Sequence, residues 1–87
     1  MENLNTEFDS AKSFYNKAQF NAEDGKIVLY SYNSRVCEIK GGKAVIITEH
    51  PQVFSNTTLR HIKEFLKQKG FKAESKEQLI ADYVEGY

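Results

Sequence analysis

Two glycine-containing dipeptides constrain the fold of this chain more than any other feature of its 87 residues. Asp24-Gly25 is a strong local signal for a β-hairpin turn, and Gly41-Gly42 favours a tight turn because glycine tolerates positive φ angles. The segments beside these turns are rich in β-branched and aromatic residues, which favour strands. The pattern predicts a four-stranded antiparallel β-meander within residues 17–48, with strands at 17–23, 26–32, 35–40 and 43–48.

The register of this meander follows from counting outward from two-residue turns, taking Asn33-Ser34 as the turn between the second and third strands. The predicted cross-strand partners are Phe20 and Leu29, Tyr30 and Cys37, Tyr32 and Arg35, and Cys37 and Ile46. Because side chains alternate along a strand, this register also predicts which residues share a face of the sheet.

Both predicted faces are largely apolar. One carries Ala18, Phe20, Ala22, Ile27, Leu29, Val36, Val45 and Ile47. The other carries Val28, Tyr30, Tyr32, Cys37, Ile39, Ala44 and Ile46, with Arg35 at its edge. We expect the first, aliphatic face to be the core, since the second mixes tyrosines with polar residues. A sheet that is apolar on both sides needs helices on both faces, or a second copy or partner on one of them.

A hydroxyl-rich stretch in front of an amphipathic segment predicts the main helix at residues 57–69. Asn56 and Thr57 are good N-cap residues, and Gly70 is suited to the position just after the helix C-terminus. The apolar side of this helix is formed by Leu59, Ile62, Phe65 and Leu66. This helix is therefore expected to pack by one face against the sheet.

Two shorter helices are expected at the ends of the chain. Ser75 and Gln78 form a capping-box pattern in front of a short C-terminal helix that extends to Tyr83. Near the start, mixed three- and four-residue spacings of apolar residues favour a short amphipathic helix within residues 5–15. The sequence thus predicts an α+β fold, in one domain that spans residues 1–87.

Charge and cysteine content bear on which partners the protein binds and on the compartment in which it acts. Twelve basic and twelve acidic residues balance, which removes the overall attraction that nucleic-acid and membrane-surface proteins usually have. Cys37 is the only cysteine, so no intramolecular disulfide can form, which is typical of a cytosolic protein. The N-terminal residues lack the basic and apolar segments of a signal peptide, and no stretch is long enough to span a membrane. We expect a cytoplasmic protein.

No motif for catalysis or cofactor binding is found. His50, His61 and Cys37 lack the spacing of a metal site, and Gly41-Gly42 joins two strands rather than opening a helix around a phosphate. Cys37 lies in mid-strand among apolar neighbours, where a thiol usually acts as a small hydrophobic residue. The hydroxyls of Thr57 and Thr58 are explained by their place at a helix start. We expect no enzyme activity, no metal and no cofactor.

Arg60 and His61 stand together in the first part of the main helix. His61 lies at the border of the apolar side, where it is expected to pack on the sheet and to bond a backbone carbonyl of residues 49–55. Thr57, Thr58 and His61 are therefore expected to be structural polar residues. Arg60 points to solvent, and its acceptor is expected to be Glu64, a carboxylate or carbonyl on the sheet, or an acidic group of a partner.

The segments "LYSYNSRVCEIKGGKAVII" and "FSNTTLRHIKEFLKQKGFKAESKEQLIADY" resemble a family of short, mostly uncharacterised proteins encoded by phages, prophages and plasmids of Gram-positive bacteria. The shared pattern is a tyrosine-containing hairpin followed by Thr-Thr-x-Arg-His-x-x-x-Phe. It matches this chain at Tyr30, Tyr32, Phe54, Ser55, Thr57, Thr58, Arg60, His61 and Phe65. The resemblance implies an accessory protein of a mobile element and brings no known activity.

Small accessory proteins of this kind often act by blocking another protein. We expect a protein that binds and blocks a host protein, such as an inhibitor of bacterial immunity in the manner of an anti-CRISPR protein. The partner-binding residues are expected to be Tyr30, Tyr32, Arg35 and Arg60, and a homodimer is also considered.

The alternative is nucleic-acid binding through the sheet and a lysine-rich helix. Its contact residues would be Lys40, Lys43, Lys63, Lys67 and Lys69. Small-ligand binding and a structural role in a virion also stay open.

Overall fold

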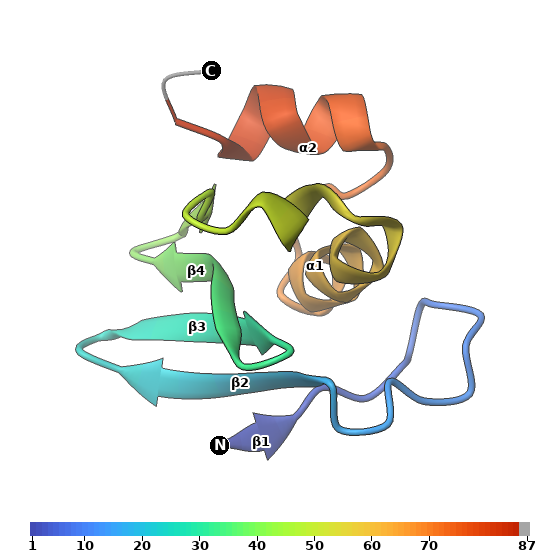
Figure 1. Ribbon diagram of the computed structural model, residues 1–87. Helices are drawn as coiled ribbons and strands as arrows, with labels where there is room; N and C mark the ends of the chain where they lie inside the picture. The colour runs from blue at the N-terminus through green and yellow to red at the C-terminus, as the bar shows by residue number, and fades with distance from the viewer. Residues whose placement is uncertain (86–87) are drawn as a thin grey trace.

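The computed structural model describes residues 1–85 and shows an α+β fold built on one antiparallel sheet (Figure 1). Its strands follow one another in chain order: β1 (Glu2–Asn3), β2 (Ala18–Glu23), β3 (Lys26–Ser31), β4 (Ser34–Lys40) and β5 (Lys43–Ile46). The predicted four-stranded meander is therefore present as β2 to β5. The fifth strand, β1, was not predicted; it is only two residues long and pairs with β2 at the edge.

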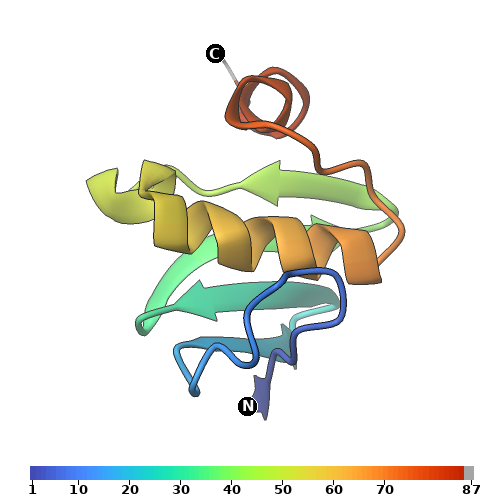
Figure 2. The same ribbon diagram turned by 90° about the vertical axis from the view of Figure 1, so that its right-hand side faces the viewer.

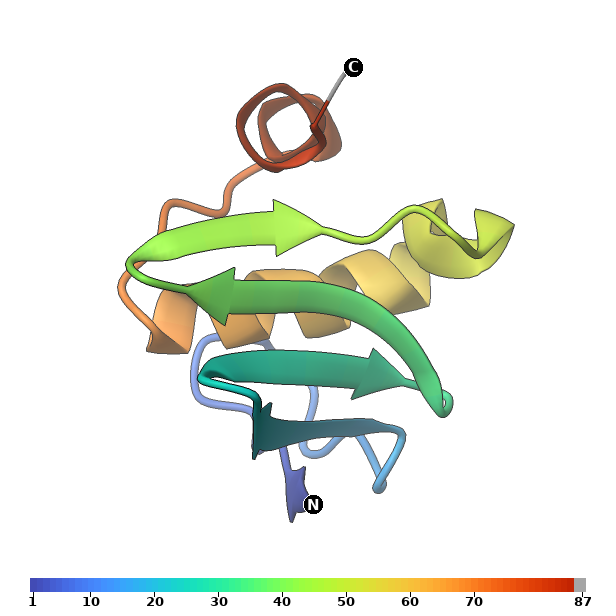
Figure 3. The ribbon, with the colours of Figure 1, turned by 90° about the vertical axis from the view of Figure 1, so that its left-hand side faces the viewer.

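Three helical elements follow the sheet: the 3-10 helix η1 (Pro51–Phe54), α1 (Asn56–Gln68) and α2 (Lys76–Tyr83). α1 runs across one face of the sheet, and α2 lies beyond the β5 edge (Figure 2). Within the described residues, no helix covers the opposite face of the sheet, as Figure 3 shows. None of the helices in residues 1–85 combines the length and the apolar character that crossing a membrane requires.

The helix ends follow their local chemistry. α1 is capped by Ser55, not by Asn56 or Thr57 as expected, because the Ser55 backbone is extended and its Oγ accepts the Thr58 N–H at 3.2 Å. Gly70 follows the C-terminus of α1 with φ +84°, as predicted. Ser75 caps α2, where its Oγ accepts the Gln78 N–H at 3.1 Å.

The predicted N-terminal helix is wrong. Residues 4–17 form an irregular segment, here called the N-terminal arm, which lies against α1. Its backbone is held by a distant group rather than by helical hydrogen bonds: the Glu64 carboxylate accepts the N–H groups of Phe8 and Asp9, at 2.9 and 2.8 Å. Its apolar residues do not form one side of a helix; instead, Leu4 and Phe14 enter the core near the two ends of the arm.

Two of the four predicted strand pairs are confirmed, namely Phe20 with Leu29 and Cys37 with Ile46. The pairs Tyr30 with Cys37 and Tyr32 with Arg35 are wrong. The turn between β3 and β4 is Tyr32-Asn33, with Ser31 opposite Ser34 and Tyr30 opposite Arg35. A bulge follows, because Leu29 pairs with Cys37 and leaves one extra residue on β4.

The corrected register changes the composition of the core. The aliphatic face of β2 and β3 does pack against α1, as expected, through residues such as Ala18 and Leu29. On β4 and β5 the core residues are Val36, Cys37, Ala44 and Ile46, with Ile39 packed beside them. Of these residues, four were expected on the other face of the sheet: Cys37, Ile39, Ala44 and Ile46. The bulge at Val36 is the physical reason, since it allows consecutive residues to enter the same core.

Candidate functional site

Two tyrosine turns lie together at one end of the sheet. Tyr15-Asn16 lies at the end of the N-terminal arm, and Tyr32-Asn33 joins β3 to β4; all four residues have positive φ angles, between 51° and 68°. The turns are linked by a hydrogen bond from the Tyr32 N–H to the Lys17 carbonyl at 2.9 Å. The tyrosines are 70% and 48% exposed. The left-handed conformation costs about 1–2 kcal/mol for a residue other than glycine, so these turns are not chosen for stability alone.

His61 lies behind the Tyr32 turn, on the side of α1 that faces the sheet. Its Nδ1 is 2.8 Å from the hydroxyl of Ser31, which lies 3.4 Å from the hydroxyl of Thr58. Its ring packs against Phe14 and Tyr32, with centroid distances of 4.5 and 5.8 Å. The expected bond to a carbonyl of residues 49–55 is not formed, because the strand beneath the helix offers a hydroxyl instead.

Burial controls the charge of His61. The side chain is 2% exposed, and desolvation, reinforced by the nearby Arg60 charge, lowers its pKa to about 4. The imidazole is therefore neutral near pH 7. Within residues 1–85, every fully buried side-chain nitrogen or oxygen has a hydrogen-bond partner, yet Nε2 has none. This atom is consequently not completely buried, and His61 is one of the residues that line a pocket here.

Arg60 is held by the N-terminal arm rather than by Glu64 or by a group of the sheet. Its Nε and Nη2 donate to the two carboxylate oxygens of Asp9, with an Nε to Oδ2 distance of 3.0 Å. This hydrogen-bonded pair lowers the pKa of Asp9 and raises that of Arg60. Glu64 is only 1% exposed, and it binds the arm backbone and the side-chain amide of Gln68 instead. The Arg60 side chain stays 48% exposed.

These elements enclose a pocket of about 240 Å³, which we call the Tyr–Arg pocket. It is formed mainly by the side chains of Phe14, Tyr15, Lys17, Tyr32, Arg60 and His61. The Lys17 ammonium lies 5.6 Å from the centre of the Tyr32 ring, within the range of a cation–π contact. The pocket thus combines aromatic walls with two cations.

The predicted partner-binding residues do not form a single patch. Tyr30 and Arg35 lie opposite each other on the face of the sheet that no helix covers, where both contact Glu23: the Tyr30 hydroxyl donates to it at 2.9 Å, and Arg35 pairs with it at 3.3 Å. Tyr32 and Arg60 instead meet at the Tyr–Arg pocket. The binding roles of Tyr30 and Arg35 stay predictions.

The lysines of the alternative hypothesis are spread over three places. Lys40 and Lys43 are paired beside the Gly41-Gly42 turn. Lys63 and Lys67 line a second pocket of about 290 Å³ between α1 and the N-terminal arm. Lys69 lies over the Phe20 ring, 5.1 Å from its centre. The structure does not align them as one basic stripe.

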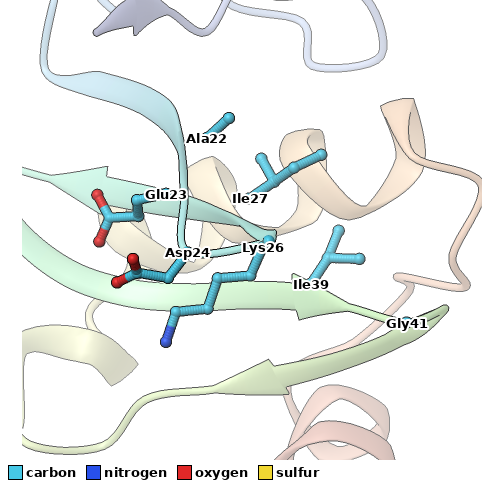
Figure 4. Close-up of a pocket in the computed structure, with 8 residues that line it drawn as sticks. Ala22, Glu23, Asp24, Lys26, Ile27, Ile39 and Gly41 are labelled. Atoms are coloured by element: carbon cyan, nitrogen blue, oxygen red, sulfur yellow. The ribbon is translucent and has the colours of Figure 1, made fainter.

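A third pocket, of about 440 Å³, lies at the opposite end of the sheet (Figure 4). Its apolar part is formed by Ala22, Ile27 and Ile39, while Glu23, Asp24 and Lys26 project on another side in Figure 4. This pocket is open to solvent, and no pair of side chains in it suggests a reaction.

Clustered metal ligands and an exposed cysteine are both absent from the described residues. No cluster of three or more His, Cys, Asp or Glu side chains that could hold a metal occurs in residues 1–85. Cys37 is fully buried, and burial raises its pKa to about 12, which keeps the thiol protonated.

Sequence reasoning missed four residues that build the site: Asp9, Tyr15, Lys17 and Ser31. One signal was available, because the dipeptide Tyr-Asn occurs twice, at 15–16 and 32–33. Asn tolerates positive φ, so a repeated Tyr-Asn pair favours two turns of the same kind. The pairing of Asp9 with Arg60 has no comparable local signal.

The fold and this site define a small α+β domain with a preformed aromatic and cationic pocket between two tyrosine turns. The chain belongs to DUF8033, a family of unknown function, which it matches over residues 2–81. This match includes every residue of the Tyr–Arg pocket. No curated protein and no solved structure matches the chain.

Proposed function

We propose that this protein is a non-catalytic binding protein, which attaches to a host protein through the Tyr–Arg pocket and the two tyrosine turns and thereby blocks it. The observation that carries the proposal is the placement of Tyr15 and Tyr32. Both are exposed, and both have backbone conformations that favour glycine or asparagine over tyrosine. A large aromatic residue at such positions is explained by contact with a partner.

The residue types and their rigidity support this role. Tyrosine and arginine are enriched among the residues that dominate binding energies at protein interfaces. The Tyr32 turn is fixed within the sheet, and the arm that carries Tyr15 is tied to α1 through Glu64 and through Asp9. Because these side chains are positioned in advance, a partner loses little free energy in ordering them.

The same geometry argues against catalysis at this site. The best candidate pair would be Ser31 and His61, since their hydroxyl and Nδ1 are 2.8 Å apart. Ser31, however, is 1% exposed, does not line the pocket, and has its oxygen between His61 and Thr58. A substrate in the pocket would meet Nε2 rather than the hydroxyl. This supports a structural role for Ser31.

The resemblance to accessory proteins of mobile elements supports a host target, and an enzyme of bacterial immunity is the proposed class. The test is capture of a protein from a Gram-positive bacterial lysate, followed by calorimetry with the purified protein. The wild type should bind it in a fixed stoichiometry. The double variant Tyr15→Gly, Tyr32→Gly should keep its turns but lose at least ~10-fold in affinity, as expected for removal of two interface anchors.

Two further variants complete this test. Lys72→Gln, an exposed change outside the pocket, is the matched control and should bind normally. Tyr30→Phe combined with Arg35→Gln shows whether the uncovered sheet face contributes. If the double glycine variant binds as well as the wild type, the proposal is wrong. Steeply salt-dependent binding to DNA or RNA would favour the nucleic-acid alternative instead.

A further inference from the structure

We infer that the Tyr–Arg pocket receives a carboxylate side chain of the partner, and that Asp9 is an internal competitor for the same arginine. This inference rests on the proposed function, because it names the chemistry of the partner at that site. It is supported by the charges that line the pocket, the free edge of Arg60, the His61 Nε2 that has no hydrogen-bond partner within residues 1–85, and the pocket volume.

The charges that line the pocket all favour an anion. Lys17 and Arg60 are cationic, His61 is neutral near pH 7, and none of the described residues that line the pocket is acidic. Thr57 also lines it, and this residue lies in the first turn of α1, where unpaired N–H groups add positive potential. Asp9 lies outside the lining and offsets only part of this charge.

The Asp9 contact shows which kind of acceptor suits Arg60. Asp9 occupies one edge of the guanidinium, formed by Nε and Nη2. The hydrogen bonds of residues 1–85 leave Nη1 without an acceptor from the protein, and the side chain is 48% exposed. A guanidinium can bind planar carboxylates on more than one edge. A second carboxylate can therefore bind Arg60 from the pocket side, more easily where Asp9 is neutralised.

His61 supplies a third donor. The Ser31 hydroxyl lies closer to Nδ1, at 2.8 Å, than to Thr58 Oγ1, at 3.4 Å. This geometry fits a hydroxyl that donates to Nδ1, which leaves the ring proton on Nε2 at the pocket surface. Such a neutral donor adds to recognition of an anion without adding charge.

The pocket volume separates a side chain from a larger ligand. Sites for drug-sized molecules and cofactors usually measure about 300–1,000 Å³, and this pocket measures about 240 Å³. A single acidic side chain, flanked by an apolar residue that contacts Tyr15 or Tyr32, fits this space better than a nucleotide does. We therefore assign the pocket to a glutamate or aspartate of a protein partner.

The test uses the full-length protein, labelled with ¹⁵N, and small probes. The peptide acetyl-Phe-Glu-amide should shift the amide signals of Tyr15, Tyr32 and Arg60, and acetyl-Phe-Gln-amide should bind at least ~5-fold more weakly, as expected for loss of the charged acceptor. Equal responses to the two peptides would overturn the inference. So would tighter binding of adenosine monophosphate or inorganic phosphate than of the glutamate peptide.

Matched variants test each donor. Lys17→Gln is an exposed change and should weaken the glutamate peptide by ~2- to 5-fold, whereas Lys72→Gln should not change it. His61→Gln keeps a donor near the position of Nε2, while His61→Asn keeps only a group near Nδ1. Binding should therefore survive better in His61→Gln than in His61→Asn. The reverse order would contradict a donor role for Nε2.

Asp9→Asn gives the sharpest result. If Asp9 only holds Arg60 in place, the variant should bind the glutamate peptide more weakly; if Asp9 competes for Arg60, the variant should bind it more tightly. Removal of the competing charge should tighten binding of the glutamate peptide by ~2- to 5-fold, even if the melting temperature falls. Weaker binding with an intact fold would overturn the competitor role. If the host protein binds Lys17→Gln normally but not the double glycine variant, the carboxylate inference fails while the proposed function stands.

Discussion

The two ends of the sheet use the same turn geometry with different residues. At one end the turns are Asp24-Gly25 and Gly41-Gly42, and at the other they are Tyr15-Asn16 and Tyr32-Asn33. All of these residues have positive φ. In the three turns that join neighbouring strands, this conformation suits the right-handed twist of the sheet, while Tyr15-Asn16 leads from the N-terminal arm into β2. The glycine end meets this requirement with residues that suit it. The tyrosine end meets it with large exposed side chains.

The difference shows at which positions this protein has a residue other than the one that would make the turn most stable. A glycine or asparagine at Tyr15 or Tyr32 would adopt the same conformation with less strain. The tyrosine end also holds a buried histidine, His61, with a buried carboxylate, Glu64, three residues further along α1, whereas the pocket at the glycine end is lined by strand and turn residues with no buried titratable side chain among them. Departures from local preference thus gather at the end where we place the binding site.

The largest effect that should separate the two ends is a pH dependence caused by His61. Its folded pKa of about 4 lies below the unfolded value of 6.5, so in this interval the unfolded chain binds the extra proton. Stability is fully present above the unfolded pKa and falls as the pH falls toward the folded pKa. On the order of 3 kcal/mol should be lost between about pH 7 and pH 4, measured by urea unfolding.

The control for this prediction is His61→Gln, which should flatten the profile. Asp9 and Glu64 have lowered pKa values, so the stability that they contribute is lost only as the pH falls below their unfolded values of 3.8 and 4.5. The interval from about pH 5 to 6.5 therefore isolates His61. An equally steep wild-type and variant profile there would show that another group titrates.

The second effect concerns the carboxylate that ties the arm, and with it the Tyr15 turn, to α1. Glu64→Gln removes a charged acceptor from the N–H groups of Phe8 and Asp9, so the free energy of unfolding should fall by about 2 kcal/mol. Hydrogen exchange of residues 5–14 should speed up with it. Glu38→Gln, on the uncovered face and partly exposed, is the matched change and should cost less than about 1 kcal/mol.

This comparison also explains which parts of the fold can be predicted from the sequence. The glycine turns, the strand alternation, Gly70 and the Ser75 cap are local signals, and the structure follows them. The tyrosine turns were not predicted, because tyrosine is not a residue that favours positive φ. Taking Asn33-Ser34 as the turn displaced the predicted partners beside it by two residues, since Tyr30 lies opposite Arg35 and not Cys37. The bulge near Val36 adds one residue to β4, and it altered which residues of β4 and β5 enter the core.

The site was predictable only in part for a related reason. Arg60 and His61 stand out in the sequence, and the position of His61 against the sheet follows from helical periodicity. Their actual partners, Asp9 and Ser31, are 51 and 30 residues away in the chain. Nothing in the local pattern of either partner indicates such a contact: the spacing of apolar residues around Asp9 favoured a helix that is not formed, and Ser31 lies in a regular strand.

A third, smaller effect would measure how much stability the protein loses by having tyrosine rather than glycine at a position with positive φ. Gly41 has φ +58°, close to the 51° of Tyr32, and an added Cβ there would meet no atom within 4 Å. Gly41→Tyr therefore tests the backbone strain without a clash, and it should lower stability by about 1 kcal/mol, or ~4–8 °C in melting temperature. Gly41→Asn should cost less, because asparagine tolerates this conformation. A neutral Gly41→Tyr would show that the two ends differ little in strain.

The smallest effect is the converse change, Tyr15→Gly. Tyr15 is 70% exposed with φ +52°, so its removal loses little packing and relieves backbone strain, while glycine adds entropy to the unfolded chain. These terms nearly cancel, and thermal unfolding should show a change between zero and a gain of about 0.5 kcal/mol in the free energy of unfolding.

Two further variants at this position are the controls. Tyr15→Asn should be at least as stable as Tyr15→Gly, since it relieves strain without adding entropy to the unfolded chain, and Tyr15→Ala should be the least stable of the three. A loss above about 1 kcal/mol in Tyr15→Gly would mean that the ring stabilises the fold. The tyrosine would then have a structural reason to be there, and the case for a binding surface at this end would depend on Tyr32 and Arg60 alone.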